Sequence, residues 1–143
     1  MTLSKFIATL AGVGLLRPAP GTWGSAVVLP CTLLGPLWCL GLAALLTLVG
    51  LWAVARLPER AEDPGWVVVD EGAGQLLALA ALAPGAGWPW VLAAFGLFRL
   101  FDVLKPGPVG WADQQKGAVG VMLDDVVAGA MAAGVLGMLR GAM

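Results

Sequence analysis

Five carboxylates flank or enter long apolar stretches of this chain, and their type and placement make them the residues best suited to chemistry: Asp70, Glu71, Asp102, Asp124 and Asp125. A carboxylate inside a bilayer-embedded helix costs about 2.5 to 3.5 kcal/mol on insertion scales, so such a residue indicates a function by default. If the five side chains converge on one face, their repulsion forces protonation unless a cation neutralises them.

A hard divalent cation fits this set of side chains best. The chain has no His, and Cys31 and Cys39 both lie inside one apolar stretch, where we interpret them as hydrophobic core residues. Oxygen-only ligands favour Mg²⁺, with Mn²⁺ as a possible substitute, and exclude structural zinc. The sequence therefore predicts that the five carboxylates are both the metal ligands and the catalytic residues.

Ion pairing alone is the structural alternative for these acids. In the segment Arg99-x-x-Asp102-x-x-Lys105, the i, i+3 spacing places the three side chains on one helical face, where they can form an intrahelical ladder. The number of acidic clusters, in a chain with only nine acids, favours a functional role.

The two acidic pairs also allow a division of roles. Asp124 and Asp125 lie about 100° apart on a helix, so one can bind metal while the other caps or pairs. Asp70 and Glu71 precede a helix that we expect to start at Gly72, and one of them can serve merely as its cap.

A glycine-rich loop at residues 12–25 runs into the start of another expected helix. Backbone N–H groups at a helix start can hold a phosphate, and Gly21 and Gly24 would allow it to approach closely. The alternative is a tight turn in which Thr22 or Ser25 is the N-cap.

The elements that must position these residues are apolar helices. Hydrophobic residues make up 59% of the 143 residues and charged residues only 12%, whereas about a quarter of an ordinary soluble domain is charged. The mean hydropathy is +0.89. We expect one integral membrane domain over residues 1–143, with room for a handful of helices. The net charge of −1 gives no basic patch for nucleic acid.

Two uncharged stretches predict helical hairpins. The 38 residues between Arg17 and Arg56 carry no charge, and Pro30, Gly35 and Pro36 divide them into arms at about 22–34 and 37–56. The 27 residues between Glu71 and Arg99 are also uncharged, and residues 83–90 break them and supply two tryptophans for an aromatic belt. A last helix is expected at about 119–140. Some arms are short enough to be half-spans or re-entrant helices.

This arrangement predicts an all-α, polytopic bundle of short hairpins with one charged face. Both hairpin turns are uncharged, so every charged residue except Arg140 falls near the same side. By the positive-inside rule that side is cytoplasmic, because it carries seven bases: Lys5, Arg17, Arg56, Arg60, Arg99, Lys105 and Lys116.

The N-terminal segment predicts an amphipathic helix lying on the membrane surface. Leu3, Phe6, Ile7 and Leu10 share one face of such a helix. A signal peptide is the less favoured interpretation, because Arg17 and Pro18 close the apolar run and no A-x-A-like site follows.

In the last helix, small residues suit close packing, which we expect within one chain rather than between two: Gly129, Ala130, Ala133, Gly134 and Gly137.

Four ordered motifs resemble the bacterial phosphatidylglycerophosphatase A family. They are GLLRPAPGTWGS at residues 14–25, DPGWVVVDE at 63–71, FRLFDVLKP at 98–106 and GVMLDDVVAG at 120–129. The resemblance covers the chain from about residue 6 to 137. It implies a Mg²⁺-dependent phosphatase of the bacterial inner membrane that removes the terminal phosphate of phosphatidylglycerophosphate.

The resemblance and the residues together predict the division of labour in the site. The five carboxylates gather one or two Mg²⁺, while the substrate phosphate is bound by Arg99, Lys105, Gly21, Thr22 and Ser25. The nucleophile is either a water molecule or one aspartate. The family commonly has Asp-Arg and Gly-Gly where this chain has Asp113-Gln114 and Gly117-Ala118. Any phosphate contact of that Arg would here be absent or replaced by Lys116.

Two rival functions are weaker. A transferase of CDP-activated lipids lacks its D-G-x-x-A-R opening here. A small transporter or channel component with an acidic ion site would distribute charges through the depth of the membrane, whereas here they are confined to one face.

Overall fold

The computed structural model describes residues 1–58 and 64–142, and the regular elements in them are all helical. The α-helices are α1 (Leu3–Ala8), α2 (Pro20–Ala26), α3 (Pro36–Ala55), α4 (Val69–Leu79), α5 (Trp88–Leu104), α6 (Pro108–Asp113) and α7 (Gly117–Gly141). Two 3₁₀ helices, η1 (Val13–Leu15) and η2 (Leu29–Leu34), complete the described elements. The expected all-α class is confirmed.

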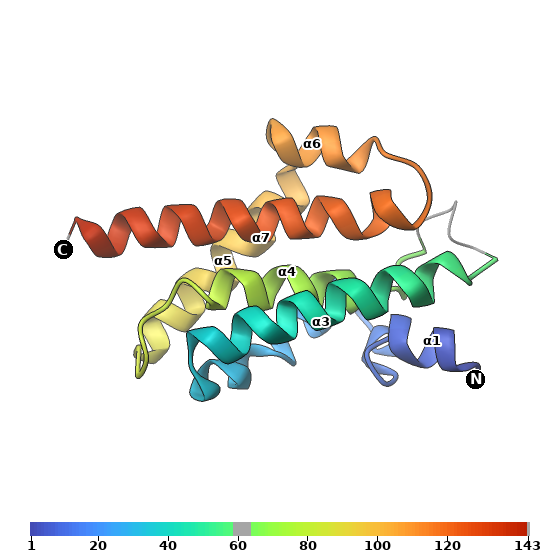
Figure 1. Ribbon diagram of the computed structural model, residues 1–143, viewed down its shortest axis with the longest axis horizontal. Coiled ribbons are helices and arrows are strands. Elements are labelled where there is room, and N and C mark those ends of the chain that lie inside the picture. Colours follow the sequence, from blue (N-terminus) through green and yellow to red (C-terminus); the bar gives the residue numbers. More distant parts are fainter. Residues whose placement is uncertain (59–63, 143) are drawn as a thin grey trace.

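Helix α4 is the centre of the bundle. Nine of its eleven residues are buried, because it packs against α3 on one side and α7 on another and also contacts α2 and α5. Figure 1 shows α7 running along the length of the molecule, with α4 and α3 beside it. The core is apolar around Phe98, Leu76 and Leu79, which are almost completely buried.

Among the described residues, two helices are long and apolar enough to cross a membrane. They are α3, with 20 residues and a mean hydropathy of 2.2, and α7, with 25 residues and a mean hydropathy of 1.7. At 1.5 Å per residue, 20 residues extend about 30 Å, the thickness of a hydrocarbon core. The expected arm at 37–56 and the expected last helix at 119–140 are therefore present with nearly the predicted bounds.

The expected helical arm at 22–34 is wrong. Residues 20–26 form the short helix α2, and residues 29–34 form the 3₁₀ helix η2, whose first turn contains Pro30. Proline has no N–H to donate and clashes with the preceding turn, so an α-helix does not continue through it. The first arm of this hairpin is short and broken, so within the hairpin only the second arm, α3, has the length of a span.

The second hairpin is present, with shifted boundaries. Helix α4 begins at Val69 rather than Gly72, so Asp70 and Glu71 belong to its first turn instead of preceding it. Residues 80–87 interrupt the helical structure as expected, but Trp88 and Trp90 lie in the first turn of α5 rather than in the break.

The expected surface helix at the N-terminus is shorter than its apolar run. Helix α1 ends at Ala8, and Leu10 and Ala11 take positive φ angles of 49° and 58°, which stop a right-handed helix. Leu3 and Phe6 are exposed, whereas Ile7 and Leu10 pack against the core. The expected single apolar face is thus divided between surface and core.

Charged residues gather at one end of the bundle. Helix α4 begins there, α5 ends there and α7 begins there, while the C-terminus lies at the opposite end in Figure 1. At that opposite end, Arg140 donates a hydrogen bond from Nη1 to the carbonyl oxygen of Ala81. Arg60 and Asp63, which entered the sequence argument, lie outside the described residues.

Candidate active site

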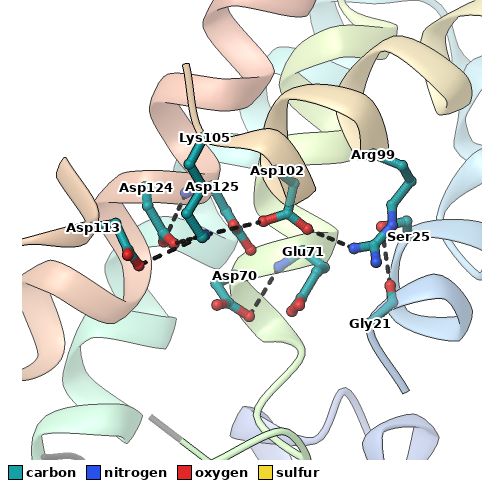
Figure 2. A network of polar contacts seen from close by, with 10 residues as sticks. All are labelled: Gly21, Ser25, Asp70, Glu71, Arg99, Asp102, Lys105, Asp113, Asp124 and Asp125. Carbon is teal, nitrogen blue, oxygen red and sulfur yellow. Dashed lines mark hydrogen bonds and ion pairs between the residues drawn. The ribbon is translucent and has the colours of Figure 1, made fainter. Parts of the chain in front are cut away.

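Carboxylates from three helices converge at the charged end of the bundle. Asp70 and Glu71 come from the first turn of α4, Asp102 from the last turn of α5, and the neighbouring Asp124 and Asp125 from α7; Figure 2 shows all five side chains facing one region. The structure therefore brings together the complete set of expected metal ligands.

A close helix crossing puts the two acidic pairs within reach of each other. A Cβ on Gly74 would lie 2.4 Å from the backbone oxygen of Asp125, and one on Gly129 would lie 2.2 Å from the backbone oxygen of Gly74. Only glycine permits this approach of α4 to α7. The expected packing role is confirmed for Gly129 but wrong for Gly134 and Gly137, which are exposed and where an added Cβ would meet nothing within 4 Å.

The carboxylates form two groups of three that share Asp125. Oxygen atoms of Asp70, Asp124 and Asp125 lie within 4.8 Å of one another, and so do oxygen atoms of Glu71, Asp102 and Asp125. The side chain that belongs to both groups is only 2% exposed. Such spacing matches oxygen ligands around a divalent cation.

Two buried carboxylate oxygens in this cluster have no hydrogen-bond partner. They are Oε2 of Glu71 and Oδ2 of Asp125. A buried charged oxygen without a donor is costly, because it has lost its hydration and gained nothing in return. A cation bound between the two groups would compensate both atoms, so the residues present fit Mg²⁺.

Two basic residues lie at the solvent side of the cluster. Arg99 contacts Asp102 through Nη1 and Oδ2 at 2.6 Å, and Lys105 contacts Asp124 through Nζ and Oδ2 at 2.8 Å. Five carboxylates thus face two cations among the residues of the cluster. This excess of negative charge is a second reason why a divalent cation suits the site.

Lys105 binds acids from three helices. Besides Asp124 of α7, its Nζ lies 3.9 Å from Asp102 of α5 and 3.6 Å from Asp113 of α6. Burial lowers the pKa of Lys105, but the hydrogen bond and charge of Asp124, with the other two acids, outweigh burial and raise the pKa above its ordinary value. The amine is therefore protonated at neutral pH.

The intrahelical ladder foreseen for α5 is present, since Asp102 contacts both Arg99 and Lys105. The acidic pairs also make local contacts: Oδ1 of Asp70 accepts from the N–H of Glu71, and Oδ1 of Asp124 accepts from the N–H of the next residue. These local contacts use one oxygen each of Asp70 and Asp124, and both residues also belong to the acidic cluster.

The glycine-rich loop forms the wall of the site beside Arg99. A Cβ on Gly21 would lie 2.8 Å from Oε1 of Glu71 and 3.2 Å from Nη1 of Arg99. The hydroxyl of Ser25 is fully buried and donates to the carbonyl oxygen of Gly21 at 3.1 Å, while Thr22 is half-buried in the same helix. Ser25 therefore stabilises α2 internally. The expected N-cap role is wrong for both Thr22 and Ser25, because both lie inside the helix and Ala19 is its N-cap.

Asp113 was not among the expected site residues, although it belongs to this network. It lies on α6, a six-residue helix in a stretch for which the sequence predicts no element. Pro108 directly after Gly107, at the first turn of that helix, is the local signal that marks its start. Lys116, which was expected to replace any phosphate contact of the family's Arg, is exposed at the N-cap of α7.

The sequence is similar to known proteins of one family. A family model described as phosphatidylglycerophosphatase A matches residues 6–140. The chain belongs to the phosphatidylglycerophosphatase A family. The four motifs that carry the resemblance contain every acid of the cluster, so family membership and the site refer to the same residues.

Curated relatives support the assignment to the phosphatidylglycerophosphatase A family. The chain is 42% identical to a phosphatidylglycerophosphatase A of Haemophilus influenzae, over 82% of this chain and 76% of the relative. It is 36% identical to the Escherichia coli phosphatidylglycerophosphatase A, over 87% and 76%. It is also 42% identical to a putative phosphatidylinositol-3-phosphatase of Bacteroides thetaiotaomicron, over 89% and 87%. No solved structure matches the chain.

Proposed function

We propose that the acidic cluster is the catalytic centre at which this phosphomonoesterase converts phosphatidylglycerophosphate to phosphatidylglycerol and phosphate, the reaction of its family. The observation that carries the proposal is the pair of three-carboxylate groups sharing Asp125, with buried oxygens of Asp125 and Glu71 that lack hydrogen-bond donors. No position in an apolar bundle would retain such a cluster without a compensating charge.

The five carboxylates would hold one or two Mg²⁺. When bound, the cation supplies positive charge that offsets the negative charge developing on the phosphoryl oxygens. Asp125 is the central ligand in this proposal because it belongs to both groups of three. Asp124 has a second task, since its Oδ2 also holds the amine of Lys105 at 2.8 Å.

Arg99 and Lys105 would bind the phosphomonoester. Their side chains are 22% and 32% exposed, whereas the Asp102 side chain between them is 10% exposed. The two basic side chains therefore reach solvent, while the carboxylates beneath them are buried. An incoming phosphate would meet the basic side chains first. Gly21 would leave room for a phosphate oxygen beside Arg99, with Thr22 and Ser25 supporting that wall.

The reaction in this proposal is a displacement by water. The water oxygen bonds to phosphorus, the ester P–O bond breaks, and the glycerol oxygen leaves and takes up a proton. Acid quenching during a single turnover of substrate with a ³²P-labelled terminal phosphate tests this step. A protein without label is the expected result, whereas label on an aspartate side chain would show an aspartyl-phosphate intermediate.

The surface of α3 supports a position in the membrane. Leu37, Leu45 and Leu48 are more than half exposed on a helix long enough to span a bilayer. We propose a multi-pass protein of the bacterial inner membrane with the acidic cluster at the cytoplasmic headgroup level. That depth suits a substrate whose phosphate is attached to a lipid.

Phosphate release from phosphatidylglycerophosphate by the purified protein in detergent tests the proposed function. We expect release with Mg²⁺, loss of release with EDTA, and recovery when excess Mg²⁺ is restored. Mg²⁺-independent release would contradict the role of the cluster. No release by folded protein under any metal condition would contradict the proposed reaction itself.

A further inference from the structure

A cleft with basic and aromatic residues lies beside the acidic cluster and has no part in the mechanism above. Its volume is about 570 Å³, and its walls come from the loop before α2 and the loop before α4, with Arg17, Pro20 and Trp66 among its lining residues. Both loops lead directly into the site, because Gly21 follows Pro20 and Asp70 comes four residues after Trp66. The cleft is therefore a neighbouring compartment of the same charged end.

The charges of this cleft are positive. Arg17 is exposed, and within residues 1–58 and 64–142 it forms no ion pair with an acid. A second cation flanks the cleft, since Nζ of Lys5 lies over the ring of Trp66 at 4.9 Å from its centre. The two compartments thus have opposite character: one is rich in carboxylates, and the other is lined by one arginine that no described acid neutralises.

The substrate of the proposed reaction carries two phosphate groups. The terminal phosphomonoester is cleaved, and a phosphodiester joins the same glycerol to the lipid. Arg99 and Lys105 are both committed to the cluster where the monoester reacts. The anionic diester, one glycerol away, needs a further cation outside that cluster.

We infer that Arg17 and its cleft bind the phosphodiester of the substrate, so that Arg17 is a specificity-determining residue for lipid phosphomonoesters with a second phosphate in the headgroup. This inference rests on the proposed function. A guanidinium forms bidentate, charge-assisted hydrogen bonds with a phosphate. Trp66 suits a headgroup position, since its ring is apolar and its N–H is a donor.

Inhibition of phosphatidylglycerophosphate hydrolysis by the two products separates the two phosphate subsites. Phosphatidylglycerol keeps the diester and lacks the monoester, whereas inorganic phosphate occupies only the monoester position. In mixed micelles, the Arg17→Gln variant is expected to raise the inhibition constant of phosphatidylglycerol and the KM of the substrate about tenfold. The inhibition constant of inorganic phosphate and kcat are expected to stay within twofold.

Arg56→Gln is the matched control. Arg56 is an arginine of the same charged end that stacks on Trp52 at 4.5 Å and does not line the cleft. Equal changes in both variants would show a general effect of surface charge and overturn the inference, as would an unchanged inhibition constant for phosphatidylglycerol in Arg17→Gln. Failure of the proposed function has a different signature, because the wild type would then release no phosphate.

Discussion

Lys105 joins acidic side chains from α5, α6 and α7 at the rim of the site, and its exchange for an uncharged residue tests the phosphate-binding role. Lys105→Met is expected to lower kcat/KM by about 10²-fold, because one cation is removed from the developing phosphate charge. Lys105→Arg should recover part of the loss, since it restores charge with different geometry. Steady-state kinetics on folded variants provide the measurement. Equal rates in Lys105→Met and wild type would contradict the role.

Gly21 tests the geometry of the wall beside Arg99. In Gly21→Ala the new methyl group would displace the carboxylate of Glu71 and the guanidinium of Arg99, both of which are ends of flexible side chains. We expect activity to fall about tenfold while the unfolding temperature shifts by roughly 2 °C or less. Gly41→Ala is the control, because nothing lies within 4 Å of the added methyl group. Full activity of Gly21→Ala would show that this wall has no catalytic importance.

The close crossing of α4 and α7 brings the acidic residues of these two helices together. Gly129→Ala would push a methyl group into the backbone of Gly74, which has no side chain that can move away. The expected loss is about 1 to 3 kcal/mol of unfolding free energy. Gly134→Ala on the same helix has open space around its methyl group and should be neutral or up to about 1 kcal/mol more stable. Thermal unfolding in one detergent measures both.

The same loss of stability in both glycine variants would mean that the crossing contributes nothing specific. A shift confined to Gly129→Ala, together with lower activity, would show that the crossing also aligns Asp125 with Asp70.

At the element level, uncharged runs and helix breakers predicted α3 well, since twenty apolar residues in a row have few other solutions. They predicted α5 and α7 with boundaries shifted by a few residues. They failed for α2 and η2, where Pro30 ends an α-helix that hydropathy alone would extend. They also failed for α6, because six residues offer little periodicity. The five acids could be predicted as a group from their placement beside apolar runs. Asp113 could not, because its contact with Lys105 depends on how α6 folds back on the bundle.

Helix α3 exposes an apolar surface on the outside of the molecule, and contact of such a surface with water is unfavourable. Leu45, in the middle of that helix, is 53% exposed, and Leu45→Arg is expected to disfavour membrane insertion by about 2.5 to 3.5 kcal/mol. Leu139→Arg is the control, because Leu139 is also exposed but lies beside Arg140 in the last turn of α7. The fraction that stays with membranes after alkaline extraction is the readout. Equal retention of both variants would contradict a membrane-spanning α3.

The location of the acids at one end of the molecule favours an enzyme over a transporter. In the described residues, the acids of the cluster come from the first turn of α4, the last turn of α5 and the N-terminal part of α7, and no second acidic group follows them through the bundle. A transport path would need ionisable groups at successive depths. The architecture suits chemistry at a membrane surface.

The most direct measurement is the rate of phosphate release from phosphatidylglycerophosphate by Asp125→Asn and Asp113→Asn at saturating Mg²⁺. Asp125 belongs to both acidic groups, whereas the side chain of Asp113 is 41% exposed and contacts Lys105 at 3.6 Å. We expect a loss of about 10²-fold or more in kcat for Asp125→Asn and a change within about twofold for Asp113→Asn. Wild-type rates in a folded Asp125→Asn variant would contradict the claim that the shared carboxylate cluster is the catalytic centre.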